Sequence, residues 1–253
     1  MILSESGELY GWGKNYSNII DQNTSTSTLK IYDELTQVIY ETTDPYKGVT
    51  YKEISVMNNG SKNIVMALGD DDYLYMWGET TLIPNIPHST IPTTGTVKID
   101  LTDSNVSYDV SHSGKVKDFS MSSDFSALIL INEDGYLYSI GDDTNNNVAG
   151  NNCHVPSNEA ARFSIIDVNC DESYNDDDKM KYISLTDQMA NAVSEDNYLY
   201  VWGDDNGGAV DNGSDHGRGK PLLIDINQDS LYDSNDKIIE TDNGNPNLNG
   251  AIT

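Results

Sequence analysis

The sequence is poor in cysteine, since its 253 residues include only Cys153 and Cys170, 17 positions apart and without CxxC spacing. This count excludes a disulfide-rich scaffold and a zinc ribbon built on cysteine pairs. The spacing leaves two interpretations open. The cysteines are unrelated loop thiols, or they form one disulfide that pins a long loop and requires an oxidising compartment.

Basic residues are also scarce. Lys and Arg number 14 against 41 Asp and Glu, which gives a formal net charge of −27 at pH 7. A surface of this sign repels phosphate, so we expect no nucleic-acid binding by direct phosphate contact and no attraction to anionic membranes. Cations, basic proteins and neutral sugars remain as partners. A high-salt habitat would explain the same acidity without any ion site.

Long apolar runs are absent too. No segment approaches the ~20 apolar residues that a membrane-spanning helix requires, so we expect no membrane insertion. The first ten residues contain neither a basic region nor an apolar core, so no secretory signal peptide is visible. Two locations therefore stay open: the cytoplasm, or a fragment of a larger surface or secreted protein.

What the sequence does contain is a fourfold repeat. Four short segments each carry Leu-Tyr, one further residue, a large apolar anchor and Gly, and each alternates as a β-strand does. We expect Leu and the anchor to share one face of the strand, with Tyr on the other. The anchors are separated by 65, 63 and 62 positions, and they are Trp12, Trp77, Ile140 and Trp202.

Two further strands precede this segment in each repeat. In the second repeat they are residues 52–55 and 63–68, and residues 70–72 form an acidic turn typical of tight hairpins. A long polar loop is expected after the Trp-Gly strand. No amphipathic helix of three turns is evident, so the chain is predicted to be an all-β fold built of four units of about 63 residues.

The two ends of the chain complement each other. Residues 1–12 and the 51 residues after Trp202 together match the length of one repeat. We therefore interpret residues 1–253 as a single repeat domain whose terminal segments share one blade. Ile2 and Leu3 are expected to pair beside Ile238, Ile239, Ala251 and Ile252, because such closure removes an open sheet edge.

The unit resembles the repeat of the regulator of chromosome condensation family. The resemblance is carried by Phe119-Ser120 through Ser126-Ala-Leu128, the turn at residues 133–135, Leu137-Tyr138, residues 141–143, and residues 191–206 of the fourth unit. It covers the whole chain. The sequence departs from the family in lacking a buried His before the Ala-Leu strand and in having Ile140 for Trp.

The resemblance implies a β-propeller, most often of seven blades. Four units are then a closed small ring, part of a larger propeller, or a half that associates with another chain, so self-association is expected if the ring is incomplete. The family's guanine nucleotide exchange activity resides in particular loops. No loop residue here matches them, so no catalytic residue is transferred.

Two acidic stretches at equivalent places in the third and fourth repeats predict calcium sites. Ca²⁺ prefers six to eight oxygen ligands, and Asp or Asn at positions 1, 3, 5, 9 and 12 of a curved loop supplies them. Glu172 and Ser230 replace the glycine usual at position 6, which weakens the sharp turn. The predicted ligands are Asp167, Asn169, Asp171, Asn175 and Asp178, and Asp225, Asn227, Asp229, Asp233 and Asp236.

Catalytic motifs are not evident, and none of the four His lies in a metal or nucleophile motif. We therefore predict a non-enzymatic propeller that binds a protein partner through its long polar loops and is stabilised by calcium. The first alternative is a calcium-dependent surface adhesion or carbohydrate-binding protein. The second is a guanine nucleotide exchange factor for a small GTPase.

Overall fold

The computed structural model describes residues 1–23, 30–42, 44–60, 62–79, 95–122, 125, 127–141, 162–186, 189–203 and 218–238. These residues form fifteen strands and three short 3-10 helices, and no helix among them is long and apolar enough to cross a membrane. The elements are β1 (Ile2–Leu3), β2 (Leu9–Lys14), η1 (Tyr16–Asn18), β3 (Ile31–Gln37), β4 (Tyr51–Asn59), β5 (Lys62–Gly69), β6 (Leu74–Gly78), β7 (Val97–Ile99), β8 (Val116–Met121), β9 (Ala127–Asn132), β10 (Leu137–Gly141), β11 (Ser164–Ile165), η3 (Asp176–Asp178), β12 (Met180–Leu185), β13 (Met189–Ser194), β14 (Leu199–Gly203), β15 (Arg218–Leu223) and η4 (Ser234–Asp236).

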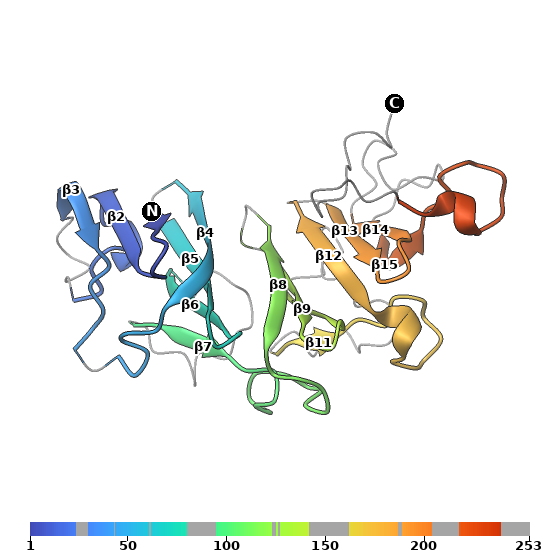
Figure 1. The fold of residues 1–253 in the computed structure, drawn as a ribbon, viewed down its shortest axis with the longest axis horizontal. Coiled ribbons are helices and arrows are strands. Elements are labelled where there is room, and N and C mark those ends of the chain that lie inside the picture. Colours follow the sequence, from blue (N-terminus) through green and yellow to red (C-terminus); the bar gives the residue numbers. More distant parts are fainter. Residues whose placement is uncertain are drawn as a thin grey trace.

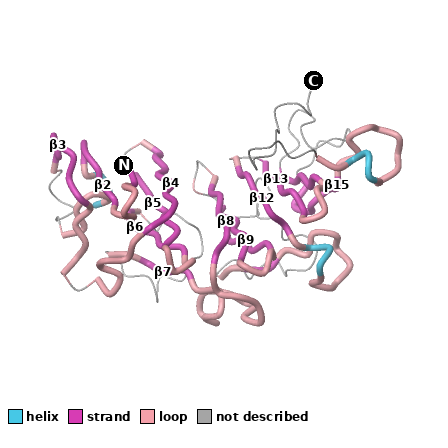
Figure 2. The backbone as a smooth tube through the Cα atoms, in the orientation of Figure 1, coloured by secondary structure: helices cyan, strands magenta, loops and turns pink. Residues whose placement is uncertain are grey.

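The strands form four antiparallel sheets, one for each predicted repeat. The first sheet has the order β1-β2-β3, and the others are β4-β5-β6-β7, β8-β9-β10-β11 and β12-β13-β14-β15. Figure 1 shows them side by side in chain order, with the first and fourth sheets at opposite ends, and Figure 2 shows that strands and loops dominate throughout. The predicted all-β architecture of four repeated units is confirmed.

The four predicted anchors lie in equivalent strands. Trp12 is in β2, Trp77 in β6, Ile140 in β10 and Trp202 in β14, and each of these strands pairs with the strand before it in a hairpin. The tight acidic turns are conventional: in each, the residue that opens the turn donates its amide to the carbonyl that closes it, as Gly69 does to Tyr73 at 2.9 Å.

Steric constraints explain why glycine follows the anchor. Gly78 has a φ of +102°, and a Cβ built there would lie 2.4 Å from the carbonyl oxygen of Asn63. Only glycine adopts this conformation and permits this approach without strain. The four glycines that follow the anchors share a positive φ, and at Gly78 the close approach of the neighbouring backbone adds to the requirement for glycine.

Each sheet has an outer strand after the Trp-Gly or Ile-Gly strand, where the sequence predicts a polar loop. These strands are β3, β7, β11 and β15, which pair with the Trp-Gly or Ile-Gly strand on its outer edge. β7 and β11 contain only three and two residues, too few to show alternation. β15 contains Pro221, which is tolerated only at a sheet edge.

The predicted sharing of faces was wrong. Leu and the anchor are three positions apart, an odd number, so a period of two places them on opposite faces. Leu74 and Met76 pack toward the third sheet, whereas Tyr75 and Trp77 pack toward the first. Likewise Leu137 packs toward the fourth sheet, and Tyr138 and Ile140 toward the second.

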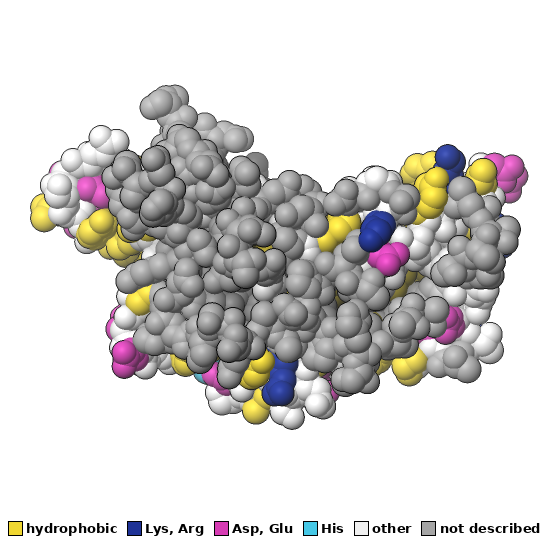
Figure 3. All heavy atoms as spheres, turned by 180° about the vertical axis from the view of Figure 1, so that it is seen from behind, with side chains coloured by type: hydrophobic (Ala, Val, Ile, Leu, Met, Phe, Trp, Pro, Cys, Tyr) yellow, Lys and Arg dark blue, Asp and Glu magenta, His cyan; other side chains and the backbone are white. Residues whose placement is uncertain are grey.

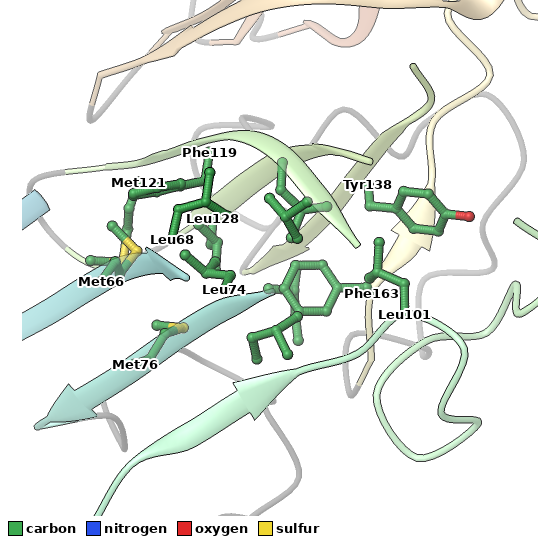
Figure 4. Close-up of a cluster of buried hydrophobic side chains, with 14 of the residues drawn as sticks. Met66, Leu68, Leu74, Met76, Leu101, Phe119, Met121, Leu128, Tyr138 and Phe163 are labelled. Atoms are coloured by element: carbon green, nitrogen blue, oxygen red, sulfur yellow. The ribbon is translucent and has the colours of Figure 1, made fainter. Parts of the chain in front are cut away.

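Three apolar layers fill the spaces between neighbouring sheets. In the layer between the second and third sheets, Met66, Leu68 and Met76 face Met121 and Leu128 (Figure 4). The large side chains of Trp77, Trp202, Tyr75 and Tyr138 are fully buried, so the scarcity of Phe is compensated by Tyr, Trp and Met. Every interior sheet therefore buries both of its faces, which is how stacked blades stabilise one another.

Successive units are also linked through their hairpin turns. The first strand of a unit donates an amide to a carbonyl in the hairpin turn of the unit before it. Tyr51 donates to Gly7 at 2.9 Å, Val116 to Asp72 at 2.7 Å, Met180 to Gly135 at 2.8 Å and Ile238 to Asn197 at 2.8 Å. Ile238 thus stands where the first strand of a fifth unit would begin.

The predicted sharing of a blade by the two termini stays a prediction. Ile2 and Leu3 do form a strand, β1, which pairs with β2 through Ile2–Tyr10 and Leu3–Leu9. Ile239, Ala251 and Ile252 lie outside the described residues. The sheets of the described chain do not form a closed ring.

The equivalent spacing of the anchors and leucines predicts equivalent environments for them, and this prediction is wrong at the two ends. Trp12 is 56% exposed, whereas Trp77 and Trp202 are fully buried. Leu199 is half-buried, whereas Leu9, Leu74 and Leu137 are buried. The sequence positions are equivalent, but burial depends on whether another sheet lies against that face.

Candidate metal centre: two homologous acidic loops

The two predicted calcium loops adopt the same backbone path. The first, residues 167–178, connects β11 to β12, and the second, residues 225–236, follows β15. Each ends in a 3-10 helix, η3 or η4, and Figure 1 shows the two as similar lobes at the same end of the molecule. Both helices have a capping box, made by Asn175 with Asp178 in one and by Asp233 with Asp236 in the other.

Predicted ligands at positions 1, 3, 5 and 9 accept amide hydrogen bonds from residues further along their own loop. In the first loop, Asp167 accepts from Glu172 at 2.8 Å, Asn169 from Asp171 at 3.0 Å, and Asp171 from Ser173 at 2.9 Å. The second loop repeats these bonds through Asp225 with Ser230, Asn227 with Asp229, and Asp229 with Leu231. Position 9 bonds in the same way in both, Asn175 with Asp177 and Asp233 with Asn235, each at 2.8 Å.

The carboxylates at position 12 close the loops. Asp178 accepts from the amides of Val168 at 2.9 Å and Asn175 at 3.1 Å, and Asp236 accepts from Ile226 and Asp233, both at 2.9 Å. Both side chains are fully buried. A buried carboxylate needs such donors, because an unpaired charge in the interior is strongly unfavourable.

The two position-12 carboxyls differ in acidity. Burial raises the pKa of Asp178, with the nearby Asp167 charge adding to the effect, even though three backbone amides oppose it. The pKa of Asp236 is lowered, chiefly by the hydrogen bond from the backbone of Asp233. The ionised carboxylate of Asp178 is therefore less favoured by its surroundings than that of Asp236.

The turn at position 6 is made without glycine. Glu172 and Ser230 have φ values of +69° and +66°, and position 4 is also left-handed, with Cys170 at +59° and Gln228 at +61°. The absence of glycine at position 6 predicts a weaker turn. The structure retains the turn and places non-glycine residues in a conformation that disfavours them.

The fit of a hard cation rests on the chemistry of the donors. All ten predicted ligands have side-chain oxygen atoms. One of these atoms, Oδ1 of Asp225, is buried and has no hydrogen-bond partner. Within the described part of the chain, no three His, Cys, Asp or Glu side chains are already gathered as a metal-binding group. The remaining ligands would therefore have to come from Asn side chains, backbone carbonyls and small movements of the loop.

Comparison with solved structures gives the architecture. The human WBSCR16 crystal structure matches with a TM-score of 0.59 and 18% identity over 88% of this chain and 49% of that one. The fold is that of an RCC1-like β-propeller. The yeast RCC1 (Prp20) structure bound to Kap60 matches at 13% identity, with a TM-score of 0.42 over 86% of this chain and 57% of that one. No family model and no curated protein matches the sequence.

The chain spans about half the length of the first solved structure that it matches. Its four sheets are accordingly an arc of a propeller in the described residues (Figure 1).

One feature of the propeller's first acidic loop was left open by the sequence. Cys170, at loop position 4, takes part in a disulfide bond, and the other cysteine of the chain, Cys153, lies outside the described residues. The interpretation as two unrelated thiols is therefore wrong. Sequence spacing alone could not decide between the two interpretations, because a disulfide forms only where the fold brings two cysteines close together.

Exposed tyrosine side chains on the outer loops were not predicted as site residues from the sequence. Tyr108, Tyr174 and Tyr232 are 37%, 39% and 56% exposed, and they lie in the segments that follow β7, β11 and β15. Burial chiefly raises the pKa of Tyr174, and the carboxylates of Asp167 and Asp109 add to it. Tyr174 therefore presents its ring among carboxylates, whereas the ring of Tyr108 lies beneath the guanidinium of Arg162, 4.8 Å from the ring centroid.

Proposed function

We propose that the protein is a non-enzymatic β-propeller module that binds a protein partner through its outer loops. The observation that carries this proposal is the recurrence of an exposed tyrosine in the loop after the outer strand of three successive units. Tyrosine is enriched in the energetically dominant part of protein interfaces because it buries a large area at a low entropic cost. A net charge of −27 favours a partner with a basic face.

The partner proposal is tested with one triple variant. Tyr108→Ser, Tyr174→Ser and Tyr232→Ser together remove the rings and leave the carboxylates in place. We expect a protein that is captured by wild type and identified by mass spectrometry to bind the triple variant at least about tenfold more weakly in a titration. Val56→Ser, at an exposed position in β4, is the matched control. Equal loss of binding in both variants would contradict the proposal.

We further propose that the two acidic loops bind Ca²⁺ and that the ion stabilises the propeller. The support is the identical path of two separate loops, their all-oxygen donor set and the unpartnered Oδ1 of Asp225. An ion bound only by the folded state adds about 2.7 kcal/mol of stability per site at about 100 times its Kd. At 2–4 °C per kcal/mol for a domain of this size, the melting temperature should rise by several degrees.

The calcium test compares CaCl2, MgCl2 and NaCl at equal ionic strength. Calcium should raise the melting temperature most, because Mg²⁺ demands octahedral geometry and loses its water reluctantly. Asp225→Ala should remove part of the calcium response, whereas Glu5→Ala, in the exposed first turn, should not. An unchanged response in Asp225→Ala, or equal melting in all three salts, would show that these loops are solvated turns.

A calcium-dependent adhesion or sugar-binding role is the second candidate, since the same loops would present both ions and tyrosines. Loss of binding to immobilised glycans on removal of calcium, with partner binding retained, would favour it.

A further inference from the structure

The first sheet turns one apolar face to solvent. Ile2, Trp12, Ile31 and Leu35 are 43%, 56%, 61% and 54% exposed. The pairing of Ile2 with Tyr10 and of Lys14 with Ile31 places them on the same face of the sheet. The opposite face holds Leu9, Tyr32 and Val38, which are buried against the second sheet. Figure 3 shows hydrophobic side chains reaching the surface at this end of the molecule, which lies on the right in that view.

The same face is covered in each of the other three sheets. Trp77 is buried against the first sheet and donates from Nε1 to the carbonyl oxygen of Ile19 at 3.0 Å. Ile140 is buried against the second sheet and Trp202 against the third. In the described chain, Trp12 alone among the four anchors has no preceding sheet against it.

The fourth sheet is open on the complementary face. Leu199, Ile224 and Ile226 are half-exposed. Their counterparts in the third unit are at most 1% exposed, because the next sheet covers them. These counterparts are Leu137, Ile166 and Val168. The correspondence follows from backbone pairing: Ile166 donates to Leu137 and Ile224 donates to Leu199, both at 2.9 Å. Their counterparts in the second unit, Leu74, Ile99 and Leu101, are equally buried.

We propose that these two open faces form a junction between two copies of this chain, in which the fourth sheet of one copy packs on the first sheet of the other. Three junctions of this type already occur within the chain, each joining the face of one sheet to the complementary face of the next. The two open faces lie at opposite ends of the row of sheets (Figure 1), so a second copy can satisfy both. Two arcs joined head to tail in this way close on themselves by two-fold symmetry.

Association must overcome repulsion between two chains that each carry −27. Salt shortens the range of that repulsion but leaves an apolar contact intact. The measurements therefore belong at both low and high NaCl, with stronger association at high NaCl.

The first measurement is sedimentation equilibrium of the full chain over a wide concentration range. We expect a species of twice the chain mass of 27.9 kDa. Trp12 is a built-in reporter, because Trp77 and Trp202 are fully buried. Acrylamide quenching of tryptophan fluorescence should therefore fall as dimer forms. A monomer with quenchable Trp12 at every concentration overturns the proposal, and so does a monomer with protected Trp12, which would mean that the chain covers its own face.

Variants identify the surfaces. Leu35→Asp on the first sheet and Ile224→Asp on the fourth should each weaken association at least about tenfold, equivalent to about 1.4 kcal/mol. Val110→Asp, exposed by 43% in the loop after β7, is the control and should leave it unchanged. If Leu35→Asp weakens the dimer and Ile224→Asp does not, the first sheets pack on each other and the proposal fails.

A mixing experiment separates surface effects from misfolding. A pair made of one Leu35→Asp copy and one Ile224→Asp copy retains one junction in which neither changed residue takes part. We expect the mixture to associate more strongly than either variant alone. Absence of this recovery, with both variants shown to be folded by circular dichroism, overturns the head-to-tail arrangement.

Discussion

At the scale of single residues, specific donors hold individual carboxylates in place. Asp72, in the acidic turn of the second unit, accepts from Nζ of Lys52 in its own sheet and of Lys115 just before the next sheet, the latter at 3.1 Å. The hydrogen bond from Lys52 is the larger cause, and with that from Lys115 it lowers the pKa of Asp72 below its ordinary value of 3.8. One carboxylate therefore links two repeats.

Asp72→Asn is expected to destabilise the protein near neutral pH, because it removes the charge that both lysines bind. A group whose folded pKa is lowered contributes stability above its unfolded pKa and loses it as the pH falls through the folded value. The difference between wild type and variant should therefore shrink below pH 3.8. Urea denaturation at neutral and acidic pH measures it. Asp33→Asn, exposed on β3, is the control, and a difference independent of pH would contradict the assignment.

Ser230→Gly should stabilise the second acidic loop. A left-handed backbone costs an L-residue roughly 1–2 kcal/mol, whereas glycine adopts it freely at an entropic cost of roughly 0.5–1 kcal/mol. The net gain is up to about 1.5 kcal/mol, and each kcal/mol corresponds to a rise of about 2–4 °C in melting temperature. Ser234→Gly, inside η4, should instead lower it. A lower melting temperature for Ser230→Gly would mean that the serine side chain has a role that offsets its strain.

At the scale of elements, the two acidic loops are alike in path and unlike in restraint. Both have the same left-handed positions and the same capping box. Only the first carries a cysteine, Cys170, whereas the second has Gln228 at that position. A covalent restraint on one of two otherwise equivalent loops allows its effect to be measured against an internal reference.

Cys170→Ser should lower the free energy of unfolding under oxidising conditions. A disulfide that closes a loop of about 15 residues stabilises by roughly 3 kcal/mol, chiefly through the unfolded chain. Thermal unfolding with and without a reducing agent measures the loss. The reducing agent should destabilise wild type and leave Cys170→Ser unchanged. Gln228→Ser, at the equivalent place in the second loop, is the control. Equal sensitivity of wild type and Cys170→Ser to the reducing agent would contradict the prediction.

At the scale of the whole molecule, sheet stacking and net charge oppose each other. Three apolar layers hold four sheets together, while 41 acidic residues against 14 basic ones repel across the surface. The ion pairs that join units, such as Lys117 with Glu195 at 3.3 Å, involve exposed side chains and contribute little individually. The stability of the fold therefore depends on the apolar layers.

Sodium chloride should raise the melting temperature, because it screens repulsion more than it weakens these few pairs. The Debye length falls from about 30 Å at 0.01 M to about 8 Å at 0.15 M, so most of the gain should come within that range. Differential scanning calorimetry at fixed pH measures it, with sucrose as a control for preferential exclusion. A melting temperature that falls with salt would show that attractive ion pairs dominate.

The sequence by itself determined the repeat, the all-β character and the hairpins. Those properties are local, because the Leu-Tyr segments, acidic turns and glycine after the anchor each specify backbone geometry within a few residues. It also located both acidic loops, whose paths depend on Asp and Asn binding neighbouring amides. Alternation was enough to place Leu74 and Trp77 on opposite faces, and the error there came from treating three positions as an even interval.

Tertiary structure alone decided which equivalent residues are buried. Trp12 and Trp77 stand at the same place in their repeats, yet one is 56% exposed and the other fully buried. The short outer strands β7 and β11 exist only because an adjacent strand offers them hydrogen-bond partners. Burial and edge pairing depend on what lies against a sheet, and that neighbour is distant in sequence or belongs to another molecule. No local pattern encodes it.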